Sequence, residues 1–194
     1  MLHKKKSYLD NSSKKTVLLA LHKPKGFICT HKDEFNRKKA IDLIPKKTLK
    51  TINGTIHSVG RLDYNSQGLL LLTNNTKIKR FLESPNNRII RTYKVKVQGI
   101  IDNNALAKIK KGLLINKIYY KVKNIKEIDK SRSYSWFIIK LDEGKNNHIR
   151  KIFLKLGFSV NKLIRIQYGP IKLSSLKSGE LKFISPFKLN LKDL

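Results

Sequence analysis

One carboxylate is the leading candidate for a catalytic group. Asp63 follows Arg61 by two residues and begins the polar segment 63–68, which separates two apolar segments of the chain. The chain holds 43 lysines and arginines against 13 aspartates and glutamates, so an acid in this position needs a physical reason. An ionised aspartate can act as a nucleophile or a general base, and a nearby arginine favours the charged form of a carboxyl group. The ordinary alternative is turn chemistry, because aspartate often hydrogen-bonds its own loop.

The stretch Ile56–Asn75 must position this carboxylate, and it predicts a strand, a loop and a second strand. Residues 69–72 are four consecutive leucines, which is typical of a strand covered on both faces. Gly68 closes the loop, and glycine can adopt backbone angles that other residues avoid. The sequence therefore predicts a central hairpin whose loop presents Asp63.

The rest of the chain mixes short strands with short amphipathic helices. Clean alternation over residues 91–99 predicts a strand with Tyr93 on its apolar face, and apolar residues at helical spacing predict a helix over residues 146–156. The other expected elements are strands over 16–21, 27–30, 113–122, 124–128, 136–141, 163–168 and 180–185, helices over 40–44, 77–84 and 102–112, and a basic loop over 46–54. This pattern predicts one α+β domain with mostly antiparallel strands over residues 16–194, preceded by a basic flexible arm over residues 1–15.

The charge balance favours polyanionic partners. The formal net charge is +30, and such a field attracts nucleic acid first and anionic membrane surfaces second. A genome rich in codons for lysine, isoleucine and asparagine is the alternative source of the excess lysine. The chain has no apolar run as long as a membrane-spanning helix and opens with no signal-peptide pattern, so nucleic acid is the favoured partner and no membrane role is expected.

Cysteine and histidine usage predict no disulfide, metal or cofactor site. Cys29 is the only cysteine, which excludes an internal disulfide and is typical of a reducing compartment, so we expect a cytoplasmic protein. The five histidines are scattered without ligand spacing, so no metal is expected. The chain contains neither a Walker loop nor a dinucleotide fingerprint, so its chemistry must run without a bound cofactor.

Several motifs together resemble one enzyme family. The stretch GRLDYNSQGLLLLTN over residues 60–74 resembles the catalytic signature of the RsuA-type ribosomal RNA pseudouridine synthases. Four further stretches resemble the family in the same order: HKPKG over 22–26, RTYKV over 91–95, EGKNNHIRK over 143–151 and LIRIQYG over 163–169. The resemblance covers nearly the whole chain from Val17.

The resemblance implies a pseudouridine synthase fold, with a mixed sheet and a cleft across its middle, and it implies roles for four residues. Asp63 would be the catalytic nucleophile or base, and Arg150 would pair with its carboxylate. Tyr93 would stack on the flipped base, and Arg61 would fill the gap that the base leaves. Without the resemblance, Arg150 is a plain surface charge, Tyr93 an aromatic on a buried strand face and Arg61 half of a surface ion pair.

Five further residues are expected to contact RNA. Lys23 and Lys25 lie in a turn near the start of the domain, and we expect both to bind phosphate. Lys145 and His148 are expected to do the same, although the family more often has arginine and glutamine at these positions. Arg165, within the strand 163–168, completes the predicted RNA-binding set.

The resemblance also bears on the substrate. The family divides between small-subunit and large-subunit ribosomal RNA, and members often carry an S4-type domain, for which the arm is too short. Its absence favours the 23S RNA of the large subunit, free or in a subunit precursor, and a monomeric enzyme is expected. Two alternatives stay open. One is a non-catalytic RNA-binding or ribosome-associated protein, and the other is a degenerate synthase that keeps the fold and the RNA affinity but has lost its catalytic rate.

Overall fold

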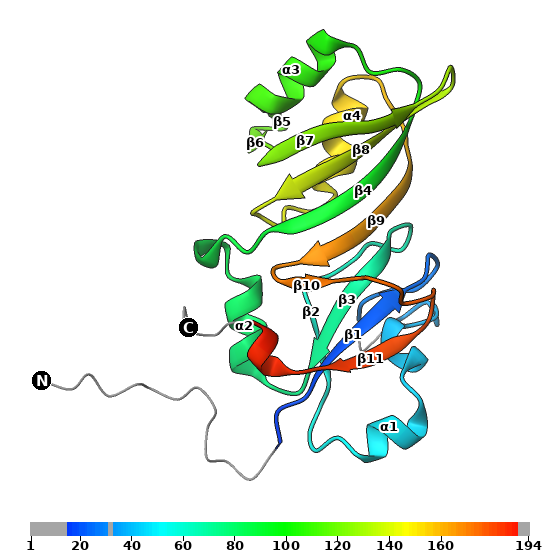
Figure 1. The fold of residues 1–194 in the computed structure, drawn as a ribbon, viewed down its shortest axis with the longest axis vertical. Helices are drawn as coiled ribbons and strands as arrows, with labels where there is room; N and C mark the ends of the chain where they lie inside the picture. The colour runs from blue at the N-terminus through cyan, green and yellow to red at the C-terminus, as the bar shows by residue number, and fades with distance from the viewer. Residues whose placement is uncertain (1–14, 31–32, 190–194) are drawn as a thin grey trace, which may run out of the picture.

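The protein is α+β, built around one large mixed sheet. A computed structural model describes residues 15–30 and 33–189, so the predicted basic arm lies outside the described residues except for Lys15. The sheet runs in the order β11-β1-β3-β9-β4-β8-β7, with β2 beside β3 and β10 beside β9 (Figure 1). Its strands are β1 (Leu18–Lys23), β2 (His57–Val59), β3 (Gln67–Thr73), β4 (Arg91–Gln98), β7 (Asn124–Lys130), β8 (Tyr134–Leu141), β9 (Val160–Tyr168), β10 (Ile171–Lys172) and β11 (Leu181–Ile184). The predicted fold class is confirmed.

Four α-helices, three 3₁₀ helices and a small hairpin complete the described chain. The helices are α1 (Lys46–Lys50), α2 (Thr76–Glu83), α3 (Asn103–Lys111) and α4 (His148–Lys155), with 3₁₀ turns at Ala40–Leu43, Pro85–Asn87 and Pro186–Leu189. The hairpin consists of β5 (Leu113–Ile115) and β6 (Ile118–Tyr120). None of the described helices combines the length and apolarity needed to span a membrane.

One short parallel contact joins the two halves of the sheet. β3 and β9 pair only through Gln67 with Ile164 and Gly68 with Arg165, and they are the one parallel pair among the described strands. Gly68 has φ +108°, and a Cβ atom there would lie 2.4 Å from the carbonyl oxygen of Arg165. Only glycine satisfies both the backbone angle and the close approach. The central hairpin is confirmed, and its glycine is where the second half of the sheet attaches.

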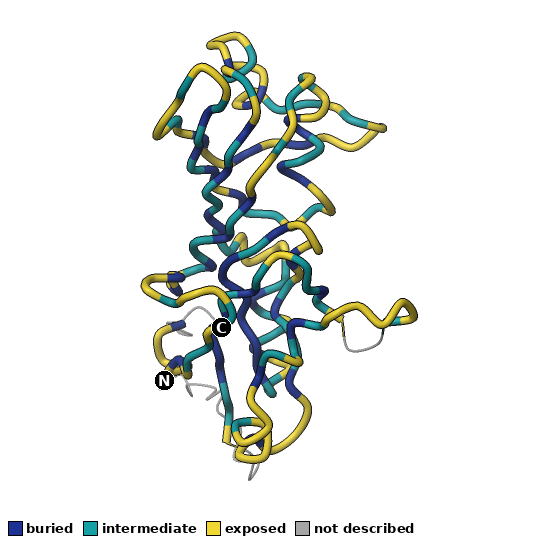
Figure 2. The backbone as a smooth tube through the Cα atoms, turned by 90° about the vertical axis from the view of Figure 1, so that its right-hand side faces the viewer, coloured by how far each residue is buried: buried dark blue, intermediate teal, exposed yellow. Residues whose placement is uncertain are grey.

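The first half of the sheet is covered on both faces. Leu69 and Leu71 pack into one hydrophobic cluster with α2, whereas Leu70 and Leu72 pack into another with the 40–56 segment. The run of leucines therefore faces apolar side chains on both sides, as its composition predicted. Figure 2 shows this buried backbone running through the centre of the molecule, with exposed residues gathered in the peripheral loops.

The second half is covered on one face only. Val95 and Val97 of β4 and Phe137 of β8 pack with α3, α4 and the β5–β6 hairpin in a separate cluster. Tyr93 is half-buried and contacts this cluster and the cluster of the 40–56 segment. It therefore lies where the two halves meet, above the β3–β9 junction.

The first turns of α2 and α3 are capped by side chains. The Asn75 side chain accepts hydrogen bonds from the first turn of α2, and the Asp102 side chain accepts one from the amide of Ala105 in α3. Gly112 ends α3, and α4 ends one residue before Leu156. These signals are local in the sequence, which is why they were readable there.

Three predicted elements are wrong. Residues 27–30 form no strand but a single bridge from Ile28 to Lys39, because neighbouring backbone groups bond a lysine ammonium and the 38–40 segment instead. The loop predicted over 46–54 begins with helix α1, whose first turn closes onto the Pro45 carbonyl. The strand predicted over 113–122 is the β5–β6 hairpin, because Asn116 and Lys117 both have positive φ and reverse the chain.

We predict that Gly68→Ala destabilises the fold by roughly 2–5 kcal/mol, because it adds backbone strain and forces packed strands apart. Gly54→Ala is the matched control, since Gly54 has a similar positive φ with no atom within 4 Å of the added Cβ. The control should lose only roughly 1–2 kcal/mol from the backbone angle. Urea denaturation measures both losses, and equal losses would contradict the close-approach argument.

Candidate active site

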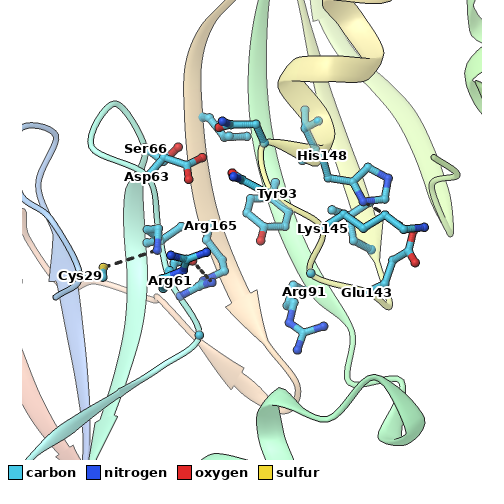
Figure 3. A pocket seen from close by; sticks show the side chains of 18 of the residues that line it. Cys29, Arg61, Asp63, Ser66, Arg91, Tyr93, Glu143, Lys145, His148 and Arg165 are labelled. Carbon is cyan, nitrogen blue, oxygen red and sulfur yellow. Dashed lines mark hydrogen bonds and ion pairs between the residues drawn. The ribbon is translucent and has the colours of Figure 1, made fainter. Parts of the chain in front are cut away.

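A cavity of about 480 Å³ lies across the junction between the two halves of the sheet. Its walls come from the 60–66 loop, β4, β9 and the 143–149 segment (Figure 3). The sequence-predicted residues that line it are Arg61, Asp63, Tyr93, Lys145, His148 and Arg165. The structure thus brings together side chains separated by about half the chain. Lys23, Lys25 and Arg150 are not part of the lining.

Asp63 is an exposed carboxylate held on an ordered loop. The amide of Ser66 donates to the Asp63 carbonyl at 2.9 Å, which closes the turn, and buried Leu62 anchors the loop to the core. No described side chain or amide donates a hydrogen bond to its carboxylate, although cations lie close enough to interact with it electrostatically. The turn is therefore maintained by the backbone, and the carboxylate is left to face the cavity.

The other two carboxylates on the cavity wall have partners. Glu83 accepts from the amide of Gly60 at 2.7 Å and from Lys79 at 2.5 Å. Glu143 accepts from Lys145 at 2.7 Å. Asp63 is therefore the one acid of the described lining whose carboxylate has no direct partner.

Lys23 lies beneath the Asp63 loop and is fully buried. Its Nζ donates to the carbonyls of Pro24, Phe27 and Ser66 at 2.9, 2.7 and 2.8 Å. Burial lowers the pKa of its ammonium to about 8, against the raising effect of Cys29 and Asp63. The predicted phosphate contact is corrected: Lys23 is an internal residue that ties the Asp63 loop to the end of β1, because all three of its donors are satisfied inside the protein.

Arg165 is a second buried cation at the same place. Its Nε donates to the Leu69 carbonyl at 2.7 Å and its Nη1 to the Arg61 carbonyl at 3.2 Å, and the side chain is 2% exposed. Its guanidinium also lies 5.0 Å from the centre of the Tyr168 ring. Arg165 thus forms part of the cavity wall and holds the loop backbone, and the RNA contact predicted for it stays a prediction.

Arg150 reaches the Asp63 loop without pairing directly with the carboxylate. Its Nη2 donates to the Asn65 carbonyl at 3.1 Å and its Nη1 to the Val160 carbonyl at 2.8 Å. Burial lowers the pKa of the Arg150 guanidinium, and the Asp63 carboxylate raises it in opposition. The direct ion pair that the resemblance implied is absent between these two described residues; Arg150 instead connects α4 to the loop and places a positive charge near it.

Arg61 and Tyr93 face the cavity, and Lys25 does not. Arg61 is exposed beside Asp63, with its carbonyl fixed by Arg165. Figure 3 shows Tyr93 between the Asp63 side of the cavity and the His148 side. Lys25 is exposed in the turn after β1, outside the lining.

Lys145 is bonded to protein groups, and His148 is buried. Lys145 donates to the Tyr119 carbonyl at 2.7 Å as well as to Glu143. His148 is 4% exposed and packs edge-on against Tyr120. Burial lowers the pKa of His148 to about 4, against the raising effect of Glu143, so its ring is neutral at pH 7. The phosphate contact predicted for His148 is therefore corrected, because a buried neutral ring offers no charge to RNA.

Sequence reasoning missed several polar residues of the lining, among them Glu83, Cys29 and Arg91. Glu83 fixes the Gly60 amide from the end of α2, and Cys29 accepts a hydrogen bond from the Leu62 amide at 3.4 Å. Arg91 is buried and donates to the Tyr168 hydroxyl at 3.0 Å. Arg91 belongs to the family-like stretch RTYKV over residues 91–95, so the sequence could have indicated it. Nothing in the spacing connects Glu83 to residue 60. Among residues 15–30 and 33–189, no three His, Cys, Asp or Glu side chains gather as a metal site requires.

The buried ring of His148 generates a pH prediction. The unfolded chain binds a proton at a histidine pKa of about 6.5, whereas the folded chain resists protonation until about pH 4. The unfolded state therefore binds more protons within this window, and the free energy of unfolding falls as the pH falls through it. Between pH 7 and pH 5, the free energy of unfolding of His148→Gln should therefore fall by about 2 kcal/mol less than that of wild type. Urea denaturation at the two pH values measures this, and parallel losses would contradict the assignment.

Comparison with known proteins agrees with this geometry. Residues 17–155 match the family model of RNA pseudouridylate synthases. An uncharacterized RNA pseudouridine synthase of Rickettsia felis is 44% identical over 177 residues, which cover 91% of this chain and 74% of the relative. The ribosomal large subunit pseudouridine synthase B of Buchnera aphidicola from Acyrthosiphon pisum is 38% identical, with 91% of this chain and 70% of the relative covered.

A solved structure supports the fold independently. A crystal structure of a pseudouridylate synthase superimposes with a TM-score of 0.77 at 24% identity, covering 91% of this chain and 74% of the other. The resemblance to the RsuA-type enzymes is confirmed by the family match and by the named relatives. The chain therefore belongs to the RNA pseudouridylate synthase family, and it is an isomerase that forms pseudouridine in RNA.

Proposed function

We propose that this enzyme converts a uridine of large-subunit ribosomal RNA to pseudouridine, with Asp63 as the catalytic nucleophile or base. The observation that carries the proposal is the state of the three carboxylates around the cavity. Glu83 and Glu143 are each committed to protein donors, whereas Asp63 is exposed and its carboxylate has no direct partner among the described residues. A basic protein that only bound RNA would gain nothing from such an acid.

The reaction needs a positioned carboxylate and no redox cofactor. The bond from the ribose C1′ to N1 of uracil breaks, the base turns, and C1′ rejoins at C5. C5 loses its hydrogen and N1 gains one, so atoms and electrons balance without an oxidant. Because the uridine is out of reach in a stacked helix, it must be flipped into the cavity, at an unstacking cost of about a few kcal/mol.

Cations lie around the loop that carries Asp63. Lys23 and Arg165 are buried beneath the loop, and Arg150 approaches it from α4, each close enough to Asp63 or to one another for electrostatic interaction. Lys23, Arg150 and Arg165 are proposed as positioning residues, because their donors go to the loop backbone.

Tyr93 and Arg61 are proposed to handle the flipped nucleotide. Tyr93 is half-buried on the cavity wall, so its ring offers a stacking surface to uracil. Arg61 is exposed at the mouth, where its guanidinium can occupy the space that the base vacates. Exposed Lys25 is proposed to contact phosphate farther along the strand.

The choice of RNA rests on the relatives. Two Buchnera proteins of 37% and 38% identity are named as large-subunit synthases, whereas the Rickettsia relatives are named for RNA pseudouridine synthesis without a target. Large-subunit ribosomal RNA, free or in a subunit precursor, is accordingly the proposed substrate.

Asp63→Asn tests the catalytic role. The variant keeps the side-chain shape and loses the charge and the nucleophilic oxygen, so pseudouridine formation should fall to background while folding and RNA binding persist. Tritium release from 5-labelled uridine in large-subunit ribosomal RNA measures the reaction, because C5 gives up its hydrogen. Glu34→Gln is the carboxylate-to-amide control, since Glu34 is exposed and lies outside the cavity lining, and it should release tritium like wild type.

The same assay tests the catalytic role of Asp63 separately from the choice of ribosomal RNA. Near-normal release by Asp63→Asn would refute Asp63 as the catalytic group. Release by wild type from small-subunit RNA instead of large-subunit RNA would refute the target and leave the catalytic role standing. No release from either RNA, naked or in subunit precursors, would favour a protein that binds RNA without modifying it.

Arg61→Ala tests nucleotide capture. We expect kcat/KM to fall by roughly tenfold or more, since a charge-assisted contact to a nucleic acid contributes about 1–3 kcal/mol. Lys47→Ala is the control, because Lys47 is exposed on α1, outside the cavity lining. Steady-state tritium release measures both variants. Equal losses in the two would remove Arg61 from the site.

A further inference from the structure

The second half of the sheet has a face opposite its hydrophobic core. Along β8, Ser135, Phe137, Ile139 and Leu141 are buried, whereas the residues between them are half-buried or exposed. Figure 1 looks onto this face, with α4 behind the strands on the covered side. We name it the open sheet face. Its residues are Lys94, Lys96, Lys126, Asp129, Tyr134, Trp136, Ile138, Lys140, Lys162 and Ile164.

Lysines lie beside aromatic and aliphatic residues on this face. The strand register places Lys96 between Lys162 of β9 and Trp136 of β8, and Lys94 between Ile164 and Ile138. Lys126 of β7 continues the second row beside Ile138, and Asp129 ends the first row beside Trp136. The face thus carries five lysines and one acid, so it presents net positive charge among apolar surfaces.

Cation–π contacts hold two of these lysines in place. The Lys94 Nζ lies 4.9 Å from the centre of the Trp136 ring. The Lys96 Nζ lies 3.8 Å from the centre of the Tyr134 ring and 5.9 Å from that of Trp136. The ammonium groups are therefore fixed over the sheet instead of extending into solvent. Their order before binding reduces the entropy lost when an anion is captured.

The composition of the face selects a nucleic acid as its partner. Phosphates pair with lysine, and the flat bases of an unpaired strand stack on aromatic rings, which is how sheet platforms hold single-stranded RNA. An acidic polypeptide would use the lysines and leave the rings without a planar partner. The enzyme already acts on RNA, so such a strand is present whenever substrate is bound.

We propose that the open sheet face is a second RNA-binding surface, which holds a single-stranded segment through phosphates on its lysines and a base on Trp136. Alternation along β4 directs Tyr93 toward the cavity and its neighbour Lys94 to the opposite face. The bound segment is therefore distinct from the one that carries the target uridine. The proposal is independent of which uridine is modified.

The fluorescence of Trp136 can report binding at this face, because Trp136 is the only tryptophan of the chain. The full chain is titrated with a 12-nucleotide oligoadenylate, which contains no uridine and cannot be a substrate. We expect saturable quenching of Trp136 fluorescence with the same Kd as a fluorescence-anisotropy measurement on labelled RNA. Poly-glutamate, an anionic polymer without bases, should bind at least tenfold more weakly and leave the emission unquenched.

Charge reversal locates the contact. Lys94→Glu/Lys96→Glu should weaken oligoadenylate binding at least tenfold and reduce the slope of log affinity against log salt by roughly 1.4, which corresponds to two phosphates of a single strand. Lys46→Glu/Lys47→Glu is the matched control, with the same charge change on α1 at the other end of the molecule (Figure 1). It should keep the affinity within about twofold and retain the full quenching.

A second variant guards against loss of folding. Lys140→Glu changes an exposed lysine of the same face that takes no part in the cation–π contacts, and it should weaken binding about threefold or more with an unchanged melting temperature. The proposal is overturned if oligoadenylate binds without quenching Trp136, if both double variants lose affinity equally, or if poly-glutamate binds and quenches as well as RNA does. Tritium release is followed in parallel, so that a failure of the catalytic assignment is seen separately.

Discussion

The short parallel contact between β3 and β9 is the constraint on which the site depends. Gly68 allows the two backbones to meet, and the Arg165 side chain then reaches the Leu69 and Arg61 carbonyls on either side of the Asp63 loop. One contact thus joins the halves of the sheet and fixes the loop that carries the carboxylate. The cavity exists because two separately packed halves touch over only two residue pairs here and diverge on either side.

The electrostatics of the loop follow from that junction. Lys23 and Arg165 are both buried, and a buried cation is stable only when its donors are satisfied and negative charge is near. Backbone carbonyls satisfy most of these donors, and they belong largely to the loop and the turn beside it. The fold therefore places positive charge under Asp63 and uses it to order the loop.

The two halves of the sheet are covered unequally, so the second half has a cavity on its covered side and an exposed face on the other. The first half buries both faces, so its strands read as continuous apolar runs, whereas the second half buries one face and alternates. The cavity opens on the covered side, between α4 and the Asp63 loop. The opposite side of β4 and β8 carries lysines that lie over aromatic rings. A chain with a net charge of +30 can attract RNA anywhere, but only ordered groups such as these can hold it in one register.

The sequence by itself determined the elements and the loop that carries Asp63, because these depend on local patterns. Alternation set β4, capping residues set α2 and α3, and Gly68 marked the close approach. Tertiary structure alone decided the environment of the charged residues. Lys23 reaches the Ser66 carbonyl across 43 residues, Arg150 reaches Asn65 across 85 and Arg165 reaches Arg61 across 104. A lysine or arginine has the same appearance in a sequence whether its charge faces RNA or a backbone carbonyl. Only the folding of distant segments onto one another separates these two cases, because burial and partners are properties of the packed chain.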